Sequence, residues 1–330
     1  MDLKNFKHWQ GKGFPLGFKE LLTHTSCFVC PMSKGARPYK HSATFKERGQ
    51  QRVPTQHAGT LEIPDEDEIT VETAEAEQEE LPADGRVDIS IDFAHAITVG
   101  KNKERYYLVI AAHGVEFTWG VPTSDRERPE LHLQQFLDLT GLRLRNIRHD
   151  DTAEFARSSS FRAWAASVHA TLCPVAGYKH TLNGKAEGAV RIAKEHVRCL
   201  LRASNLPRRF WPWAVTHWHR IYAYWVKKNG QTGWDGLPSH TFNQSAERDL
   251  AAPWGCYVIG HMSREHPLVK SDTTHEDRAL EGAFLGWDLT TPTFWMWSFR
   301  LKQVVRLEGP RFSKFYPFRN PEAVVNNKHF

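Results

Sequence analysis

The amino-acid sequence predicts an α/β fold in which helices flank a mixed β-sheet, followed by a smaller β-rich region. Apolar and polar residues alternate over 87–93, which is typical of a half-buried strand, and 105–112 is a fuller apolar run. Further strands are predicted at 115–122 and 144–148, and helices at about 127–140, 158–168, 184 onward and 208–228. Strands that alternate with helices favour a layered sheet with helices on its faces.

Charge and composition divide the chain into four segments. Residues 1–57 carry ten Lys and Arg against three acids, whereas 65–84 hold ten acids and no Lys or Arg. We therefore predict a basic region at 1–57 and an acidic linker at 58–85, too polar to offset the entropy of ordering. The α/β core is expected at 86–230, and short β-like segments predict a small β-rich domain at 231–330.

Overall composition restricts the class of protein. The chain is ordinary for a globular protein at 40% hydrophobic residues, and its net charge of +5 favours a polyanionic partner. No apolar run approaches the roughly 18 residues that span a bilayer, and the N-terminus has no secretory pattern. Five cysteines with one close pair are a poor disulfide framework, so we expect a protein that is not secreted and has no membrane partner.

Three acids lie where the predicted sheet would gather ligands. Asp92 ends the first strand, Asp150 follows the strand at 144–148, and Glu187 lies in the first turn of the long helix. Mg²⁺ and Mn²⁺ prefer carboxylate oxygens. Two such ions about 4 Å apart activate an attacking hydroxyl and stabilise the leaving oxygen of a phosphodiester. Acids at strand ends and helix starts are also commonly solvated, so spacing alone leaves both interpretations open.

A basic stripe follows Glu187 on the same helix. At 100° per residue, Arg191, Lys194, Arg198 and Arg202 lie within about 60° of its direction, and the apolar residues occupy another face. Cations in such a row can track phosphates. We predict that Lys185, Arg191, Lys194 and Arg198 bind DNA.

Six short motifs occur in order along the chain. They are Ile91-Asp92-Phe93 with Tyr106-Tyr107-Leu108-Val109, Arg148-His149-Asp150-Asp151-Thr152-Ala153-Glu154-Phe155, Asn183-Gly184-Lys185-Ala186-Glu187, Asn205-Leu206-Pro207-Arg208-Arg209-Phe210-Trp211, Trp254-Gly255-Cys256-Tyr257-Val258 and Gly282-Ala283-Phe284-Leu285-Gly286-Trp287. Together they resemble the integrase of Copia-type LTR retrotransposons, which has an RNase H-like fold of the retroviral integrase superfamily. The resemblance covers about 27–315.

The resemblance implies a function and a set of partners. Asp92, Asp150 and Glu187 would be the catalytic carboxylates and hold Mg²⁺ or Mn²⁺ in a two-metal site. The activity would be 3′-end processing of the element's DNA and strand transfer into target DNA. Such a protein is expected to form a homo-oligomer and to act in the nucleus after cytoplasmic synthesis.

Departures from the family pattern keep alternatives open. Asp150 leaves 36 residues before Glu187 where the family has 35, and Asp151 leaves 35. We prefer Asp150 because its offset to Glu154 matches the motif, and Asp88 is a lesser candidate for the first acid. Asp151-Thr152-Ala153 replaces the family's Asn-Gly-Gly. A catalytically inactive remnant that still binds nucleic acid is therefore the chief alternative, and a structural fragment of a longer polyprotein is a third.

Other candidate residues have two interpretations each. Cys27 and Cys30 have the spacing of half a Zn²⁺ site, which in the family completes a His-His-Cys-Cys module; free thiols in a truncated module are the alternative. The tryptophans of the helix at 208–228 are more often core than base-stacking platforms. Loop histidines such as His113, His149 and His180 are expected to be solvated. Cations of the β-rich domain, such as Lys302 and Arg306, would serve DNA binding or domain packing.

Overall fold

The computed structural model describes residues 85–175, 183–226, 230–238, 240–262, 279–313 and 315–318. The predicted basic region, with Cys27 and Cys30, lies outside these ranges, as does almost all of the predicted linker. Within the described ranges, no helix has the length and apolarity that a membrane crossing requires.

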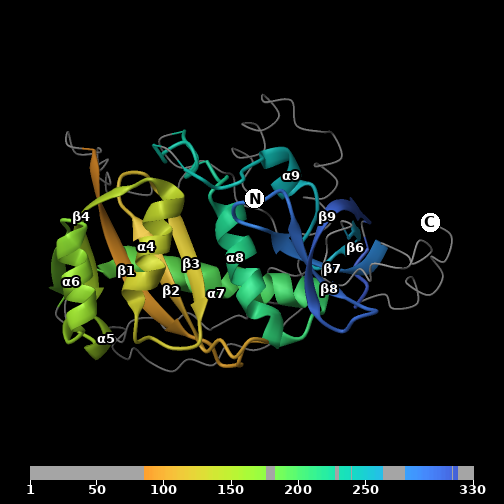
Figure 1. The fold of residues 1–330 in the computed structure, drawn as a ribbon, viewed down its shortest axis with the longest axis horizontal. Coiled ribbons are helices and arrows are strands. Elements are labelled where there is room, and N and C mark those ends of the chain that lie inside the picture. The colour runs from red at the N-terminus through yellow and green to blue at the C-terminus, as the bar shows by residue number, and fades with distance from the viewer. Residues whose placement is uncertain are drawn as a thin grey trace, which may run out of the picture.

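A five-stranded mixed sheet forms the centre of the core (Figure 1). Its order is β3-β2-β1-β4-β5, with β1 Arg86–His95, β2 Tyr106–Ala112, β3 Thr118–Thr123, β4 Arg143–Asp150 and β5 Thr171–Val175. Strands β1, β2 and β3 pair antiparallel. Strand β4 pairs parallel with β1, and β5 pairs parallel with β4. The two edge strands each contain a proline, Pro122 in β3 and Pro174 in β5. The predicted mixed sheet is confirmed.

Helices cover both faces of this sheet. They are α4 Pro129–Thr140, α5 Ala153–Ala156, α6 Ser159–Ser167, α7 Gly184–Ser204, the 3-10 turn η2 Arg208–Phe210, α8 Trp211–Tyr222 and α9 Ala246–Leu250. Figure 1 shows α4 in front of the sheet and α7 behind it. Strand β1 explains the two layers, because its side chains alternate. Ile89 and Ile91 pack with α4 and α6, whereas Ala94 packs with α7 and α8.

A closed four-stranded barrel follows the core. It consists of β6 Tyr257–His261, β7 Ala279–Trp287, β8 Phe294–Ser298 and β9 Val304–Phe312. Gly282 is required where β7 meets β8, because a Cβ there would lie 2.1 Å from the carbonyl oxygen of Trp297. The predicted β-rich region is confirmed. Ala283, Leu285 and Trp297 of the barrel share an apolar cluster with α8, so the barrel packs directly on the core.

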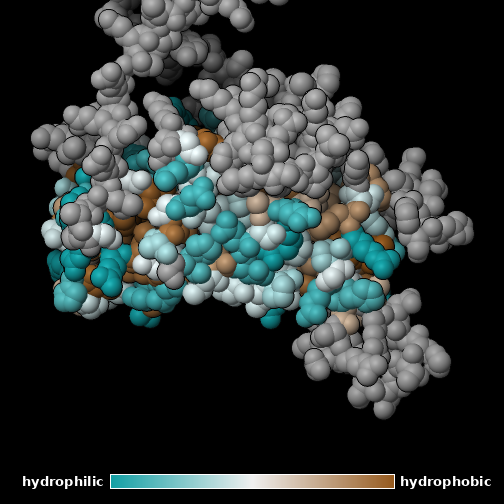
Figure 2. All heavy atoms as spheres, turned by 90° about the horizontal axis from the view of Figure 1, so that it is seen from above, coloured by the Kyte–Doolittle hydropathy of each residue, from teal (hydrophilic) through white to brown (hydrophobic). Residues whose placement is uncertain are grey.

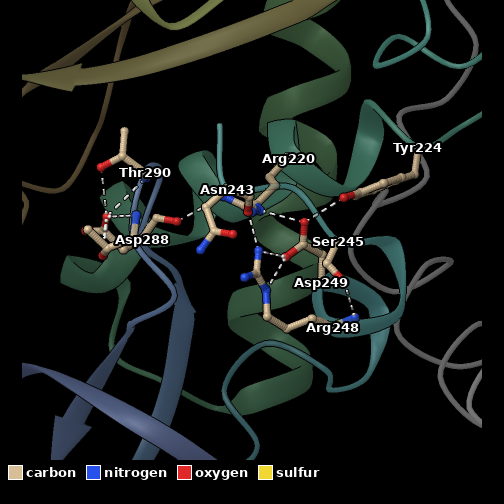
Figure 3. A network of polar contacts seen from close by, with 9 residues as sticks. Arg220, Tyr224, Asn243, Ser245, Arg248, Asp249, Asp288 and Thr290 are labelled. Carbon is tan, nitrogen blue, oxygen red and sulfur yellow. Dashed lines mark hydrogen bonds and ion pairs between the residues drawn. The ribbon is translucent and has the colours of Figure 1, made fainter. Parts of the chain in front are cut away.

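A buried polar network joins α8 to α9 and to the β7–β8 turn (Figure 3). Arg220 is 1% exposed and donates to Asp249 Oδ2 at 2.8 Å and to the carbonyl of Asp288 at 3.1 Å. Tyr224 donates its hydroxyl to the same Asp249 oxygen at 2.7 Å, and Arg248 donates to the other oxygen. Every charge in this network meets an opposite charge or a dipole, as a buried ion pair requires.

Some local predictions need correction. The short strand β5 and the helices α5 and α9 have no counterpart in the sequence-based prediction. His113 and His149 are buried rather than solvated, at 8% and 1% exposure. The tryptophans of α8 belong to the core as predicted: Trp211 and Trp218 are buried, and Trp213 packs partly buried against the same cluster. Over the described surface seen in Figure 2, hydrophilic residues alternate with small hydrophobic patches.

Candidate active site

Strand pairing brings Asp92 and Asp150 to neighbouring positions. Strands β1 and β4 run parallel, with Ser90 opposite Arg148. Two residues further along, Asp92 and Asp150 continue the same register on the same face, because side chains two apart in a strand point the same way. Both side chains are half-buried. The two acids predicted at strand ends therefore lie side by side, near the C-terminal ends of the paired strands β1 and β4.

The electrostatics of Asp92 show which charges surround it. The pKa of its carboxyl is raised to about 6, chiefly by burial and also by the nearby carboxylates of Asp150 and Glu187. The backbone N–H of Phe93 and the ammonium of Lys194 act in the opposite direction. Like charges in a half-buried cluster disfavour ionisation of each other. Asp150 and Glu187 thus both lie within electrostatic reach of Asp92.

Helix α7 positions Glu187 beside the strand that carries Asp92. The buried side chain of Asn183, just before the helix, donates to the carbonyl oxygen of Ile91 at 3.3 Å. Ala186, Val190 and Ala193 bury one face of the helix against the core. The opposite face is left exposed, and Glu187 lies on it in the first turn.

The basic stripe occupies the exposed face of α7, as the helical periodicity predicts. Arg191, Lys194, Arg198 and Arg202 are all exposed. Lys194 lowers the pKa of Asp92, so at least this cation acts on the acidic site directly. Lys185 differs from the rest of the predicted DNA-binding set, because its ammonium lies 2.9 Å from the carboxylate of Glu116.

The structure distinguishes Asp150 from Asp151. Asp150 is half-buried at the end of β4, and its carboxylate accepts a hydrogen bond from Thr152 Oγ1 at 3.0 Å. Burial is the main cause of its raised pKa, which the Thr152 hydrogen bond counters and the charge of Glu154 reinforces. Asp151 is exposed. The side chain next to Asp92 is therefore that of Asp150.

Asp88, the lesser candidate for the first acid, is held by cations. It is 6% exposed and accepts from Arg145 at 2.8 Å, from Arg148 at 3.0 Å and from Asn146 at 3.0 Å. Burial alone would raise the pKa of its carboxyl, but the two guanidinium groups hold it below the usual value. A carboxylate neutralised in this way has little charge left for a metal ion.

The structure has a pocket near Asp150 that the sequence patterns did not predict. It has a volume of about 610 Å³ and lies between the start of β2, the β3–α4 loop and α5. Arg126 spans it, with one nitrogen 2.7 Å from Glu154 and its guanidinium 5.2 Å from the ring of Tyr106. Neighbouring elements build this pocket, so no local motif marks it.

The three acids are chemically suited to a divalent metal ion. All three offer hard oxygen ligands, and burial together with the charges of Asp150 and Glu187 raises the pKa of Asp92. In the described ranges, however, no three His, Cys, Asp or Glu side chains are grouped closely enough to hold an ion. Asp92 and Asp150 are neighbouring carboxylates of the type that a divalent cation prefers, and Glu187 is exposed in the first turn of α7. Cys27 and Cys30 lie outside the described residues.

No protein-family model and no curated protein matches this chain. Two examples illustrate the solved structures that it resembles. One is the simian T-cell lymphotropic virus intasome in complex with PP2A regulatory subunit B56 gamma, at 12% identity over 68% of this chain and 76% of that chain, with a TM-score of 0.40. The other is the HTLV-2 integrase catalytic core domain in complex with magnesium, in its trimeric form. It is 18% identical over 46% of this chain and 96% of that chain, with a TM-score of 0.36. Scores this low do not assign a family, so we infer function from the residues and geometry of this chain.

Proposed function

We propose that this chain is a Copia-type integrase with an RNase H-like core that cuts and joins DNA. The observation that carries the proposal is the position of Asp92 near Asp150 and Glu187, because burial and then the charges of these two acids raise the pKa of Asp92 to about 6. Half-buried acids that repel one another, beside an exposed row of cations, are suited to a metal ion and a phosphodiester. The ordered motifs around these residues support the same function.

Each group of residues has a part in the proposed reaction. Asp92, Asp150 and Glu187 would hold Mg²⁺ or Mn²⁺, which when bound activates an attacking hydroxyl and stabilises the leaving oxygen. Arg191, Lys194 and Arg198 would contact phosphates along the helix and hold the DNA beside the acids. In end processing the attacking group is water, and in strand transfer it is the 3′ hydroxyl of the element. In both reactions one P–O bond forms as another breaks.

We also propose DNA partners, a homo-oligomeric state and a nuclear location for this protein. The DNA partners are the element's ends and a target duplex, and the protein is proposed to act as a homo-oligomer in the nucleus. Cys27 and Cys30 would give two thiolates to a Zn²⁺ site in the basic region.

Strand transfer on a short duplex with Mn²⁺ tests the proposal. We expect joined products from the wild type and a loss of at least about 100-fold in Glu187→Gln, because one metal ligand is lost. Glu195→Gln is the matched control, since it removes a carboxylate eight residues further along the same helix and should keep activity. Asp150→Asn should be as inactive as Glu187→Gln, whereas Asp151→Asn should be active. Equal activity in Glu187→Gln and the wild type would reject the proposed site.

Two observations favour a second function. The three acids are not grouped as metal ligands in the described residues, and Thr152-Ala153 replaces Gly-Gly next to Asp150. An inactive remnant that retains nucleic-acid binding would have these features. Such a protein would bind duplex DNA in the same assay, with affinity that falls steeply with salt, and would yield no joined product.

A further inference from the structure

The loop between β1 and β2 exposes two apolar side chains beside the acidic site. Ile97 is 99% exposed and Val99 is 48% exposed. In the described part of the chain, the other exposed large hydrophobic residue is Leu131 of α4, at 51%. Single exposed apolar residues are common on proteins. Two of these three exposed residues lie on one short loop, five and seven residues after Asp92 and just after the end of β1.

Hydrogen bonds hold the backbone of the loop that carries these side chains. Ala96 donates to the carbonyl of Arg105 at 2.9 Å, and Gly100 donates to that of Glu104 at 2.7 Å. Two further bonds fasten the loop to η2 and α8. The N–H of Lys101 donates to the carbonyl of Arg209 at 2.9 Å, and the indole of Trp211 donates to that of Thr98 at 2.8 Å. A side chain on a rigid loop loses little freedom when it is buried by a partner.

Cations occur close in sequence to the two apolar residues, and one of them, Lys101, lies over the ring of Trp297 at 4.6 Å. Lys101, Lys103 and Arg105 belong to the loop, and the exposed Arg208 and Arg209 belong to the turn that it contacts. Glu104 is the one acid between 96 and 105, and its carboxylate accepts the backbone N–H of Asn102 at 2.8 Å. An excess of positive charge around a small apolar tip matches a polyanion that also offers an apolar interior. Duplex DNA has both properties.

The position of the loop fits the same partner. Figure 1 shows it, in orange, running from the end of β1 to beneath α8. Ile97 follows Asp92 by five residues, and an extended chain of that length spans at most about 17 Å. This is roughly the length of five base pairs. A duplex held with a phosphate at Asp92 therefore has bases within reach of Ile97.

We propose that Ile97 inserts between neighbouring base pairs of duplex DNA bound at this edge of the sheet, and that it kinks the duplex. The inference rests on the proposed DNA-processing function and adds a residue that deforms the DNA. Apolar wedges unstack a base step at a cost of a few kcal/mol, and contacts made by the bent duplex offset that cost. The flanking cations supply such contacts, and Val99 lies against the opened step.

The size of the apolar surface argues against a protein partner. A specific protein interface buries about 1,000 Å² or more in total. The two apolar side chains Ile97 and Val99 offer far less apolar area than this. A wedge needs a single protruding side chain, which is what Ile97 provides.

Fluorescence of 2-aminopurine in duplex DNA tests the inference on the full chain, without divalent metal. The base analogue brightens when it is unstacked, and it is placed in turn at each step of a 30-base-pair duplex. We expect one step to brighten with the wild type and with Ile97→Leu, and to fall to near the free-duplex level with Ile97→Ala. Affinity should change by less than about threefold, because phosphate contacts dominate it. Leu131→Ala, which truncates an equally apolar exposed residue, is the matched control and should behave as the wild type.

The outcomes separate this inference from the proposed function. If Ile97→Ala keeps the bright step, or if the wild type binds without brightening any step, the wedge is rejected and DNA binding stands. If Ile97→Asp alters the sedimentation mass of the protein while the bright step persists, the loop contacts another protein copy and the wedge is also rejected. Failure of the wild type to bind duplex at low salt rejects both. A parallel loss of FRET-measured bending in Ile97→Ala would support the wedge independently.

Discussion

Asp88 and Asp92 lie on the same face of the same strand, four residues apart, yet their surroundings are opposite. Asp88 meets two guanidinium groups and an amide, which hold the pKa of its carboxyl below the usual value. Asp92 lies near the carboxylates of Asp150 and Glu187. Burial and the charge of these two groups raise the pKa of Asp92 to about 6. The first arrangement lowers the free energy of the folded chain. The second raises it, because a partly buried carboxylate lies near other carboxylates.

The α8–α9 network extends this comparison. Asp249 is fully buried, but Arg220, Arg248 and Tyr224 satisfy both of its oxygens. Burial alone therefore does not mark a functional acid in this chain. A functional acid is better indicated by burial together with nearby negative charges. Among Asp88, Asp92 and Asp249, this combination applies to Asp92. This difference can be tested by removing each charge in turn.

The largest effect should come from Asp88→Ala. The change leaves Arg145 and Arg148 without their shared carboxylate, and we expect a loss of roughly 2–4 kcal/mol in the free energy of unfolding. Urea denaturation measures it. The control is Asp138→Ala on α4, where an exposed carboxylate bonded to Gln134 is removed and the change should stay below about 1 kcal/mol. An equally small change for Asp88→Ala would mean that the arginines do not stabilise the strand.

Asp92→Asn should have the opposite sign. In the folded chain Asp92 has a pKa of about 6, above its unfolded value of 3.8, so its ionised form opposes folding. Without divalent metal at pH 8, we expect the variant to be more stable than the wild type by roughly 1–3 kcal/mol.

The gain in Asp92→Asn should depend on pH in a defined way. A raised folded pKa contributes stability that is complete below the unfolded pKa and is lost as the pH rises through the folded pKa. The difference between variant and wild type should therefore be largest above about pH 7, shrink through pH 6 and vanish near pH 4. A difference that is constant from pH 4 to pH 8 would contradict the charge repulsion around Asp92.

The smallest effect concerns added Mg²⁺. An ion that binds the folded chain alone stabilises it by mass action, by about 1.4 kcal/mol at ten times its Kd. We expect this rise in thermal stability in the wild type and in Asp151→Asn, and its loss in Asp92→Asn and Asp150→Asn. Thermal melts with and without Mg²⁺ measure it. A rise that persists in Asp92→Asn would place the ion elsewhere.

Local sequence patterns predicted much of the sheet and the face of α7. Alternation over 87–93 fixes which residues of β1 face each layer, because a strand has a period of two. The same rule puts Asp92 on the face of Asp88 and Ser90. The spacing of Val190, Ala193 and Val197 fixes the buried side of α7, and with it the exposed stripe. Structural features that depend on residues close together in the chain could therefore be predicted from the amino-acid sequence.

Features made by distant residues could not be predicted in this way. Asp249 pairs with Arg220, 29 positions earlier, and neither neighbourhood indicates the other. His149 is buried because its ring packs on Phe155 and Phe161. The loop-like sequence around it does not show these contacts. Strand β5 is short and contains Pro174, so its apolar pattern is weak. Pairing with β4, which the parallel register provides, is what makes it a strand.

The prolines in β3 and β5 have a consequence for self-association. The free edge of a sheet offers N–H and C=O groups to which a strand of another molecule can add, and this is a common route to aggregation. Proline has no N–H to offer, and in sheets it is confined to edges and bulges. Pro122 and Pro174 thus weaken both open edges of the core sheet as templates, and the barrel is closed. Copies of this chain should therefore associate through side-chain surfaces rather than by extending one continuous sheet.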